Sequence, residues 1–243
     1  MSKKVINQNS NYDLELLNSI DSNFTFDENP INRLKNIANN VKKGNGFDEF
    51  DKEKELKELK LQINSINNCN LKDNSKKIVL GDGNINSPIM LVGEAPGAEE
   101  DSVGQTFLGE VGDLLKKMLN AINIKKEDIY STYAVNYRPP EDRKPTPAEI
   151  KRYSQFLQKQ ISIIKPEIII LMGSTAMESL TGLKNKISME RGKWKEIIVK
   201  NTNYKVIITF NPSYLLRVPE NKKYSWEDLK KIKQKIVDLK LNI

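Results

Sequence analysis

Residues 93–115 decide the fold, and they read GEAPGAEEDSVGQTFLGEVGDLL. The apolar run from Pro88 to Val92 precedes them and is typical of a buried strand. Apolar residues at helical spacing follow, namely Leu115, Met118, Leu119 and Ile122. A strand, a loop rich in Gly and Pro, and a helix N-terminus together form a site for a polar or anionic ligand. Acidic residues crowd this loop, which argues against a simple phosphate site.

Apolar runs alternate with amphipathic segments along the rest of the chain. The candidate strands are Ile89–Val92, Ile129–Val135, Ile168–Met172 and Val206–Thr209. The candidate helices are Val111–Ile122, Pro147–Ile164, Thr175–Leu180 and Trp226–Leu239. This alternation predicts an α/β fold with three layers, α/β/α, around a short parallel central sheet. The ligand site of such a sheet lies beyond the carboxyl ends of its strands.

We predict that residues 1–65 form a partly disordered, partly helical extension and that residues 66–243 form the main domain. Residues 1–12 are polar and are expected to be disordered, and short helices are expected at Tyr12–Ile20 and Ile31–Val41. An amphipathic helix that docks on the main domain is expected from Asp51. Its apolar residues are Leu56, Leu59, Ile63 and Ile66.

The net charge of +7 is unevenly distributed. Residues 1–70 carry 10 basic and 11 acidic side chains, whereas residues 71–243 carry 29 basic and 21 acidic ones. A positive domain suits a polyanionic partner such as DNA. The same balance also follows from the Lys-rich and Asn-rich composition that an AT-rich genome produces.

Several classes of site are excluded by composition. A single cysteine, Cys69, cannot form an intramolecular disulfide or a cysteine zinc site, and the chain has no histidine. No apolar run approaches the ~18 residues of a membrane span, and the first residues have no hydrophobic signal core. We therefore expect a cytoplasmic protein without membrane contact.

Further segments extend the pattern in a fixed order. They are Tyr137–Pro140 (YRPP), Pro145–Glu149 (PTPAE), Gln160–Ile161, Lys165–Pro166, Arg191–Trp194 (RGKW), Asn211–Arg217 (NPSYLLR) and Trp226–Leu229 (WEDL). Together with GEAPGAEED and TFLG, they resemble the uracil-DNA glycosylase superfamily, and in particular its family-four type. The resemblance runs from about Asn68 to about Lys240. It implies a bacterial hydrolase of base excision repair that cleaves the N-glycosidic bond of uracil, or of a related deaminated base, in single- or double-stranded DNA.

The resemblance also implies a set of pocket residues. Such an enzyme flips the nucleotide out of the stack, holds the base and stabilises the charges that develop when the bond breaks. Phe107 matches the aromatic residue that stacks on the base. Glu94 and Asn211 are the candidate catalytic residues. The remaining substrate-binding candidates are Gly93, Ala95, Pro96, Gly97, Tyr133 and Ser213.

DNA contacts are expected from two of the matching segments. Arg191 and Lys193 of RGKW, and Arg217 of NPSYLLR, are the candidates for phosphate contacts. Leu215 and Leu216 are the candidates for the wedge that fills the gap left by the flipped base, with ordinary packing in the core as the alternative for both leucines.

Two pocket positions depart from the pattern of the family. Asn211 stands where the family usually has histidine, although mismatch-specific relatives also have asparagine there, and its amide still donates a hydrogen bond. Tyr133 stands where an asparagine reads uracil. Tyrosine is bulkier and has a single hydroxyl, so recognition is expected to suffer. Asn136 lies three residues further on, faces the opposite side of an extended strand, and cannot take over that role.

A third departure concerns metal. Typical family-four enzymes hold an iron–sulfur cluster with four cysteines. Cys69 matches one of them, whereas Ile66, Tyr137 and Tyr153 occupy the other three positions. One thiolate cannot hold such a cluster. We therefore predict no iron, no other metal and no cofactor, and we expect the two tyrosines to pack where the cluster would lie.

Three interpretations remain at this stage. The first is a cluster-free uracil-DNA glycosylase, expected to act as a monomer. The second is a catalytically silent DNA-binding relative with the same fold. The third is a Rossmann-like nucleotide-binding protein with no role on DNA, which the basic balance and the RGKW and NPSYLLR segments count against.

Overall fold

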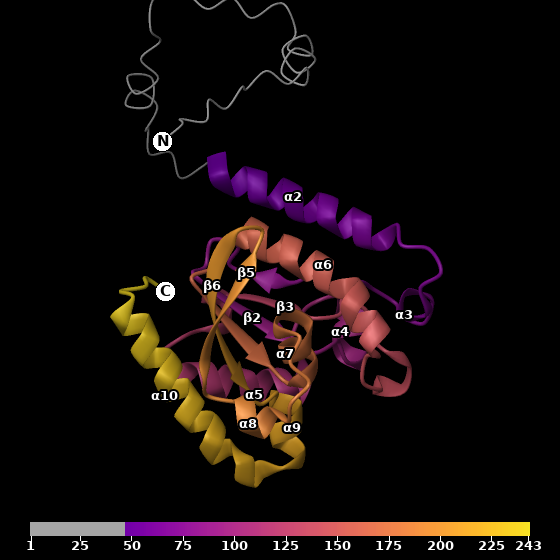
Figure 1. Cartoon of the computed structure of the whole chain (residues 1–243). Coiled ribbons are helices and arrows are strands. Elements are labelled where there is room, and N and C mark those ends of the chain that lie inside the picture. The colour runs from indigo at the N-terminus through magenta and orange to yellow at the C-terminus, as the bar shows by residue number, and fades with distance from the viewer. Residues whose placement is uncertain (1–46) are drawn as a thin grey trace, which may run out of the picture. The chain divides into compact units, whose positions relative to one another are not determined.

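The computed structural model describes residues 47–243, which form a six-stranded sheet with helices on both faces (Figure 1). The expected disorder at 1–12 and the expected helices at Tyr12–Ile20 and Ile31–Val41 lie outside the described residues. None of the helices in residues 47–243 is both long and apolar enough to span a membrane.

The strand order in the sheet is β1-β3-β2-β4-β6-β5. In that order, the strands are Asp82–Gly83, Tyr130–Tyr133, Ile89–Gly93, Ile168–Met172, Thr202–Thr209 and Trp194–Val199. The four inner strands are parallel, as predicted, and β1 and β5 pair antiparallel at the two edges. The sheet is therefore mixed, with a parallel centre.

Strand β6 is twice as long as the segment predicted for it. It covers Thr202–Thr209, and β5 folds back on it as a hairpin that the sequence analysis did not predict. Residues Lys200 and Asn201 turn the chain with φ of 44° and 65°. A two-residue turn of this hand usually carries glycine, so Lys-Asn gives no clear hairpin signal.

Side chains of the inner strands alternate between two core layers, because successive residues of a strand point to opposite faces. Met90, Ile169 and Ile208 pack on one face with α2 (Phe47–Asn64), α6 (Pro147–Ile164) and α7 (Ser174–Thr181). Ile89, Ile170 and Ile207 pack on the other face with α5 (Gly109–Asn120) and α10 (Lys222–Asp238). This arrangement confirms the three-layer prediction.

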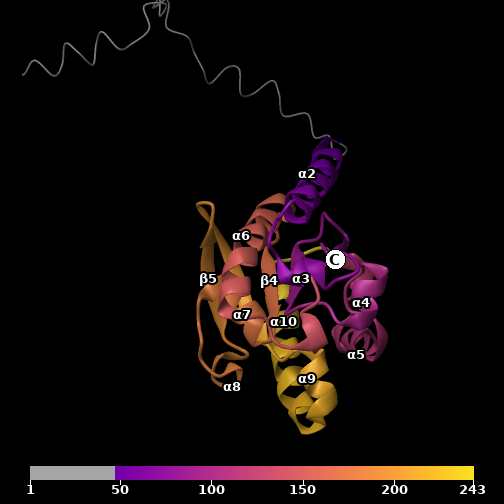
Figure 2. The same cartoon turned by 90° about the vertical axis from the view of Figure 1, so that its right-hand side faces the viewer.

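Shorter helices complete the connections. The α-helical ones are α3 (Asn70–Asp73), α4 (Ala98–Val103), α8 (Ile187–Glu190) and α9 (Pro212–Arg217). The 3₁₀ turns are η1 (Lys126–Asp128), η2 (Pro140–Asp142) and η3 (Pro219–Asn221). Helix α9 lies beside α10 at the end of the molecule away from α2 (Figures 1 and 2).

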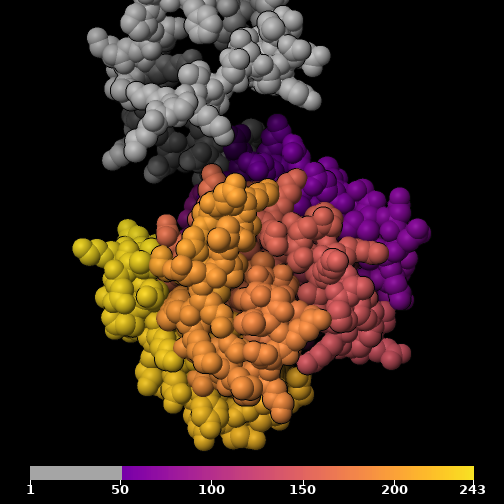
Figure 3. All heavy atoms as spheres, in the orientation of Figure 1, coloured from indigo at the N-terminus to yellow at the C-terminus, as the bar shows by residue number. Residues whose placement is uncertain are grey.

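Helix α2 packs along α6, and their atoms lie in contact in the space-filling view (Figure 3). Leu56, Leu59 and Ile63 are buried in this interface, and Ile66 packs against it, so the predicted docking of this amphipathic helix is confirmed. The compact unit that contains the sheet includes all of residues 47–243. Residues 47–65 of the predicted extension therefore pack on the domain.

Candidate active site

Glu94 is the first residue after β2, at the carboxyl edge of the parallel strands. Its Oε1 accepts hydrogen bonds from the Thr175 backbone N–H at 2.9 Å and the Ser174 hydroxyl at 3.2 Å. Both partners belong to the first turn of α7, where free amides favour a negative charge. Gly173 precedes them with φ of 102°, and a Cβ there would lie 2.4 Å from the Glu94 carboxyl carbon. Glycine at this position therefore allows the carboxylate to reach the helix.

Asn211 leaves β6 at the same edge and begins α9. Its Oδ1 accepts a hydrogen bond from the Ser213 N–H at 3.0 Å, which caps the helix and fixes the orientation of the amide. The other end of the amide, Nδ2, donates to Oε2 of Glu94 at 3.3 Å. Residues 117 positions apart in the chain thus form one half-buried carboxylate–amide pair, as the two candidate catalytic residues require.

Phe107 lies in a strained backbone conformation beside this pair. Its φ is 50°, which bulky residues rarely adopt, and its side chain is almost completely buried. The Phe107 ring packs on the Tyr133 ring, with centroids 4.9 Å apart and planes tilted by 37°. A Cβ at Gly93 would lie 2.7 Å from both rings, so glycine is needed there.

Tyr133 is engaged through its hydroxyl as well as its ring. The hydroxyl accepts the Phe107 N–H at 2.9 Å and donates to Glu100 Oε1 at 3.3 Å. Burial, and then the negative charge of Glu100, raise the pKa of Tyr133 well above its ordinary value. The carboxylate of Glu100 also accepts the backbone N–H groups of Leu108 at 2.9 Å and Gly97 at 3.0 Å.

These residues surround one cavity of about 280 Å³. Nine of the predicted site residues line it, namely Glu94, Ala95, Pro96, Gly97, Phe107, Tyr133, Asn211, Ser213 and Arg217. Gly93 lies directly behind the two rings. Asn136 does not line the cavity; its side-chain amide donates to the Val79 carbonyl at 3.0 Å.

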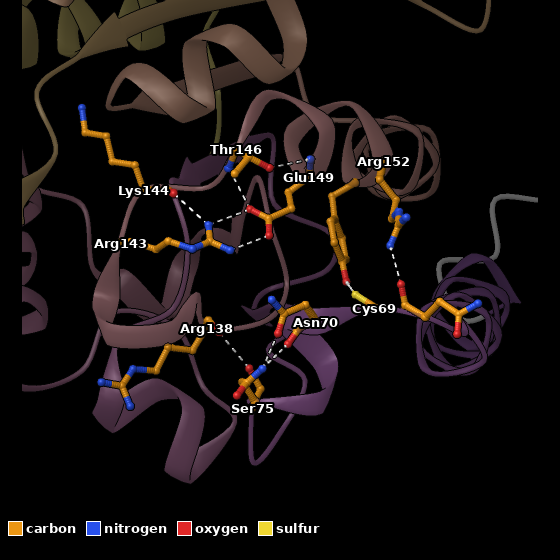
Figure 4. Close-up of polar contacts among 12 residues, drawn as sticks. Cys69, Asn70, Ser75, Arg138, Arg143, Lys144, Thr146, Glu149 and Arg152 are labelled. Carbon is orange, nitrogen blue, oxygen red and sulfur yellow. Dashed lines mark hydrogen bonds and ion pairs between the residues drawn. The ribbon is translucent and has the colours of Figure 1, made fainter.

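The sequence analysis missed one wall of the cavity, the loop after β3. Arg143 and Lys144 line it, and the guanidinium of Arg143 forms two hydrogen bonds with Glu149, at 2.7 and 2.9 Å (Figure 4). These bonds lower the pKa of the Glu149 carboxyl, which also accepts the Thr146 N–H in the capping box of α6. The sequence did carry a signal for this wall, because two adjacent cations lie between the matching segments YRPP and PTPAE, in the loop that follows a parallel strand.

The predicted phosphate contact of Arg191 does not fit its surroundings. Its guanidinium donates to both carboxylate oxygens of the buried Asp228, at 2.6 and 3.0 Å, and also to the Tyr224 carbonyl. It lies over the rings of Phe210 and Tyr224 as well. The Arg191 side chain is only 14% exposed, so it ties the segment after α8 to α10 instead of presenting a free charge.

The two leucines of NPSYLLR differ in exposure. Leu215 lies on the buried side of α9 and is corrected here to a core residue, because a wedge must reach the DNA. Leu216 is 36% exposed and keeps the wedge assignment as a hypothesis. Arg217 and Lys193 are exposed, so both remain free to meet phosphates.

Comparison of the sequence with known proteins identifies the family of this chain. The sequence profile of the "Uracil DNA glycosylase superfamily" matches residues 80–232. The chain belongs to this superfamily. A "Type-4 uracil-DNA glycosylase" of Thermotoga maritima is 37% identical over 187 residues, covering 76% of this chain and 96% of the relative. Proteins with the same name are 34% identical in Archaeoglobus fulgidus, over 73% of this chain and 91% of the relative, and 32% identical in Pyrobaculum aerophilum, over 68% and 86%.

Packed side chains fill the position where the family-four resemblance would place an iron–sulfur cluster. The Cys69 sulfur lies 3.3 Å from the Tyr153 hydroxyl in the core (Figure 4). The Tyr137 and Tyr153 rings meet edge to face, 6.3 Å between centroids, and the Tyr137 hydroxyl donates to Asn64 at 2.6 Å. One thiol among aromatic rings does not fit the four-thiolate donor set of a cluster.

We therefore expect purified protein to contain far less than one iron atom per chain. The prediction rests on the donor set at Cys69, where a single thiol lies among tyrosine rings in place of four thiolates. Elemental analysis together with the visible absorption spectrum of anaerobically purified protein tests it. Iron near four atoms per chain, with a thiolate–iron absorption band, would contradict it.

Proposed function

We propose that this protein is a hydrolase that removes uracil from DNA in base excision repair. The observation that carries the proposal is the Glu94–Asn211 pair, held beside Phe107 in one cavity at the carboxyl edge of the sheet. The names of the relatives support the same reaction. The protein is proposed to act as a monomer in the cytoplasm of a bacterium, as predicted from the sequence.

Binding begins with extrusion of the nucleotide from the DNA stack into the cavity. The flipped base stacks on the Phe107 ring, with the Ala95–Gly97 backbone along its edge. Leu216 enters the gap left in the DNA, and Arg217 at the cavity mouth contacts a neighbouring phosphate. Stacking on an aromatic ring contributes about 1–3 kcal/mol per base.

Cleavage breaks the bond between sugar C1′ and uracil N1, and the electron pair leaves with the base. The sugar becomes cationic and the uracil anionic. Asn211 Nδ2 has two hydrogens; one faces Glu94, and we assign the other to the O2 oxygen of the leaving base. The Glu94 carboxylate stabilises the cationic sugar and orients a water molecule. The water oxygen then bonds to C1′, and the released proton passes through Glu94 to the uracil anion.

The direct test incubates the protein with oligonucleotides that contain one uracil, single-stranded and paired with adenine or guanine. Alkaline cleavage then reports abasic sites. Strand cleavage at uracil, with release of free uracil, supports the proposal. Matched oligonucleotides with thymine or cytosine at the same position measure the base specificity.

A silent DNA-binding relative is the second candidate, and Tyr133 favours it. The hydroxyl of Tyr133 is committed to Phe107 and Glu100, so it does not offer the paired donor and acceptor of an asparagine. Binding of uracil-containing DNA without cleavage of any base would establish this candidate. The variant Tyr133→Asn, Asn211→His would then be expected to gain excision over wild type.

We also expect DNA affinity to fall steeply with salt, with a log–log slope near −0.9 per duplex phosphate contact. The double variant Lys193→Ala, Arg217→Ala should reduce the magnitude of the slope by about 1.8, because two exposed cations are removed. The exposed Lys54 on α2, at the other end of the molecule, supplies the control variant Lys54→Ala, which should leave the slope unchanged. Fluorescence anisotropy between about 50 and 200 mM salt measures it. Affinity that is flat over this range would contradict DNA as the partner.

A further inference from the structure

We propose that Tyr133 is a positioning residue that holds Phe107 in its base-stacking conformation through a hydroxyl bridge to Glu100. The inference rests on the proposed function. It gives a role to a residue that the resemblance describes only as the loss of the asparagine that reads uracil. Three observations carry it: the backbone of Phe107, the contacts of Glu100 and the packing of the two rings.

The backbone of Phe107 needs outside support. A non-glycine residue with φ of 50° is in a sparsely populated conformation that persists only where its surroundings fix it. The Phe107 N–H is buried and has the Tyr133 hydroxyl as its acceptor, at 2.9 Å. Removing that acceptor leaves a buried donor unsatisfied, which favours a different backbone conformation.

Glu100 connects this hydrogen bond to the rest of the cavity wall. Its carboxylate accepts from the Tyr133 hydroxyl, from the N–H of Leu108 and from the N–H of Gly97. The residue after Phe107 and the turn before α4 are thus fixed by one buried side chain. Because the pKa of Tyr133 is raised, its hydroxyl stays protonated and remains a donor to Glu100.

The rings complete the support. The Tyr133 ring lies 4.9 Å from the Phe107 ring, and the missing side chain at Gly93 leaves room for both. The Tyr133 hydroxyl has both partners inside the protein, so it orients the stacking surface instead of reading the base. Hydrogen bonding to the base then falls to Asn211 and the backbone of Ala95 and Pro96, because the Gly97 N–H already donates to Glu100.

The test separates contacts to the flipped base from contacts to the rest of the DNA, and it uses two duplexes. One duplex contains 2′-fluoro-2′-deoxyuridine, which resists cleavage because fluorine disfavours a cationic sugar. The other contains a tetrahydrofuran abasic analogue, which has no base to stack. The Kd for the abasic duplex divided by the Kd for the fluorinated uracil duplex measures the contribution of the base to affinity. Phe107→Ala should lower this ratio by about 5- to 150-fold, the range of base–aromatic stacking.

Tyr133→Phe, which removes only the hydroxyl, should lower the ratio by about 5-fold and leave the affinity for the abasic analogue unchanged, because only base stacking depends on Phe107. Glu100→Gln should act in the same direction, since it weakens the same bridge. The matched control is Tyr130→Phe in the same strand. Its buried hydroxyl accepts a hydrogen bond from Gln160 at 2.7 Å, away from the cavity, so the ratio should not change.

A Tyr133→Phe variant that keeps the wild-type ratio overturns the positioning role. So does an equal fall in the Tyr130→Phe control, which would show a general loss of packing in the strand. Failure of the proposed function appears differently: wild type itself would bind the two duplexes equally and would excise no uracil.

Discussion

Replacing Glu94 by glutamine is expected to lower the single-turnover rate of uracil excision by about 100- to 10,000-fold, the range of a positioned acid–base group. Glutamine has a similar shape but no negative charge, and the charge is needed most when the sugar becomes cationic. Affinity for uncleaved DNA should change little. Rapid-quench measurement with enzyme in excess over a uracil oligonucleotide gives the rate directly.

Glu99→Gln is the matched control, because Glu99 lies in the same acidic run but is exposed and does not line the cavity. Its rate should stay close to that of wild type. A Glu94→Gln variant within a factor of about three of wild type would contradict a catalytic role for this carboxylate.

Asn211→Ala is expected to lower turnover by about 100- to 1,000-fold, the usual effect of losing one donor to a developing negative charge. It should also cost about 0.5–2 kcal/mol of stability, because the Asn211 side chain caps α9. The two effects have different causes, since the Oδ1 end of the amide serves the helix and the Nδ2 end faces the cavity.

Asn211→Ser separates them. Serine is as good an N-cap as asparagine, but its short hydroxyl does not reach the position of the amide nitrogen. We expect a Tm close to wild type together with the low turnover of the alanine variant. Recovery of both stability and turnover in Asn211→Ser would show that the residue acts only through the helix.

The elements that were predicted most accurately carry their own local signals. Pro147–Ile164 was predicted to the residue because Thr146 and Glu149 form a capping box and proline occupies the first turn. Ile168–Met172 was equally clear, since a strand buried on both faces is continuously apolar. Strand β5 was missed because its mixture of polar and apolar residues becomes a strand only by pairing with β6.

The site shows a similar division. The resemblance placed Glu94, Phe107 and Asn211 in one pocket although they lie far apart in the chain, and all three line the same cavity in the structure. It could not distinguish Leu215 from Leu216, because which side of so short a helix faces the core depends on the elements packed around it. Nor could it show that Arg191 is paired, since its partner Asp228 lies on α10 and the contact exists only after folding.

The packing of Tyr137 and Tyr153 on Cys69 has a consequence for how the cell makes this protein. The chain alone supplies every group in that corner, and the contacts form when residues 69 and 153 meet in the folded domain. If this corner holds no cluster, as predicted, maturation of the protein requires no iron delivery and no cluster-assembly machinery. We then expect a cell starved of iron, or exposed to oxidants that destroy iron–sulfur centres, to complete this fold as usual.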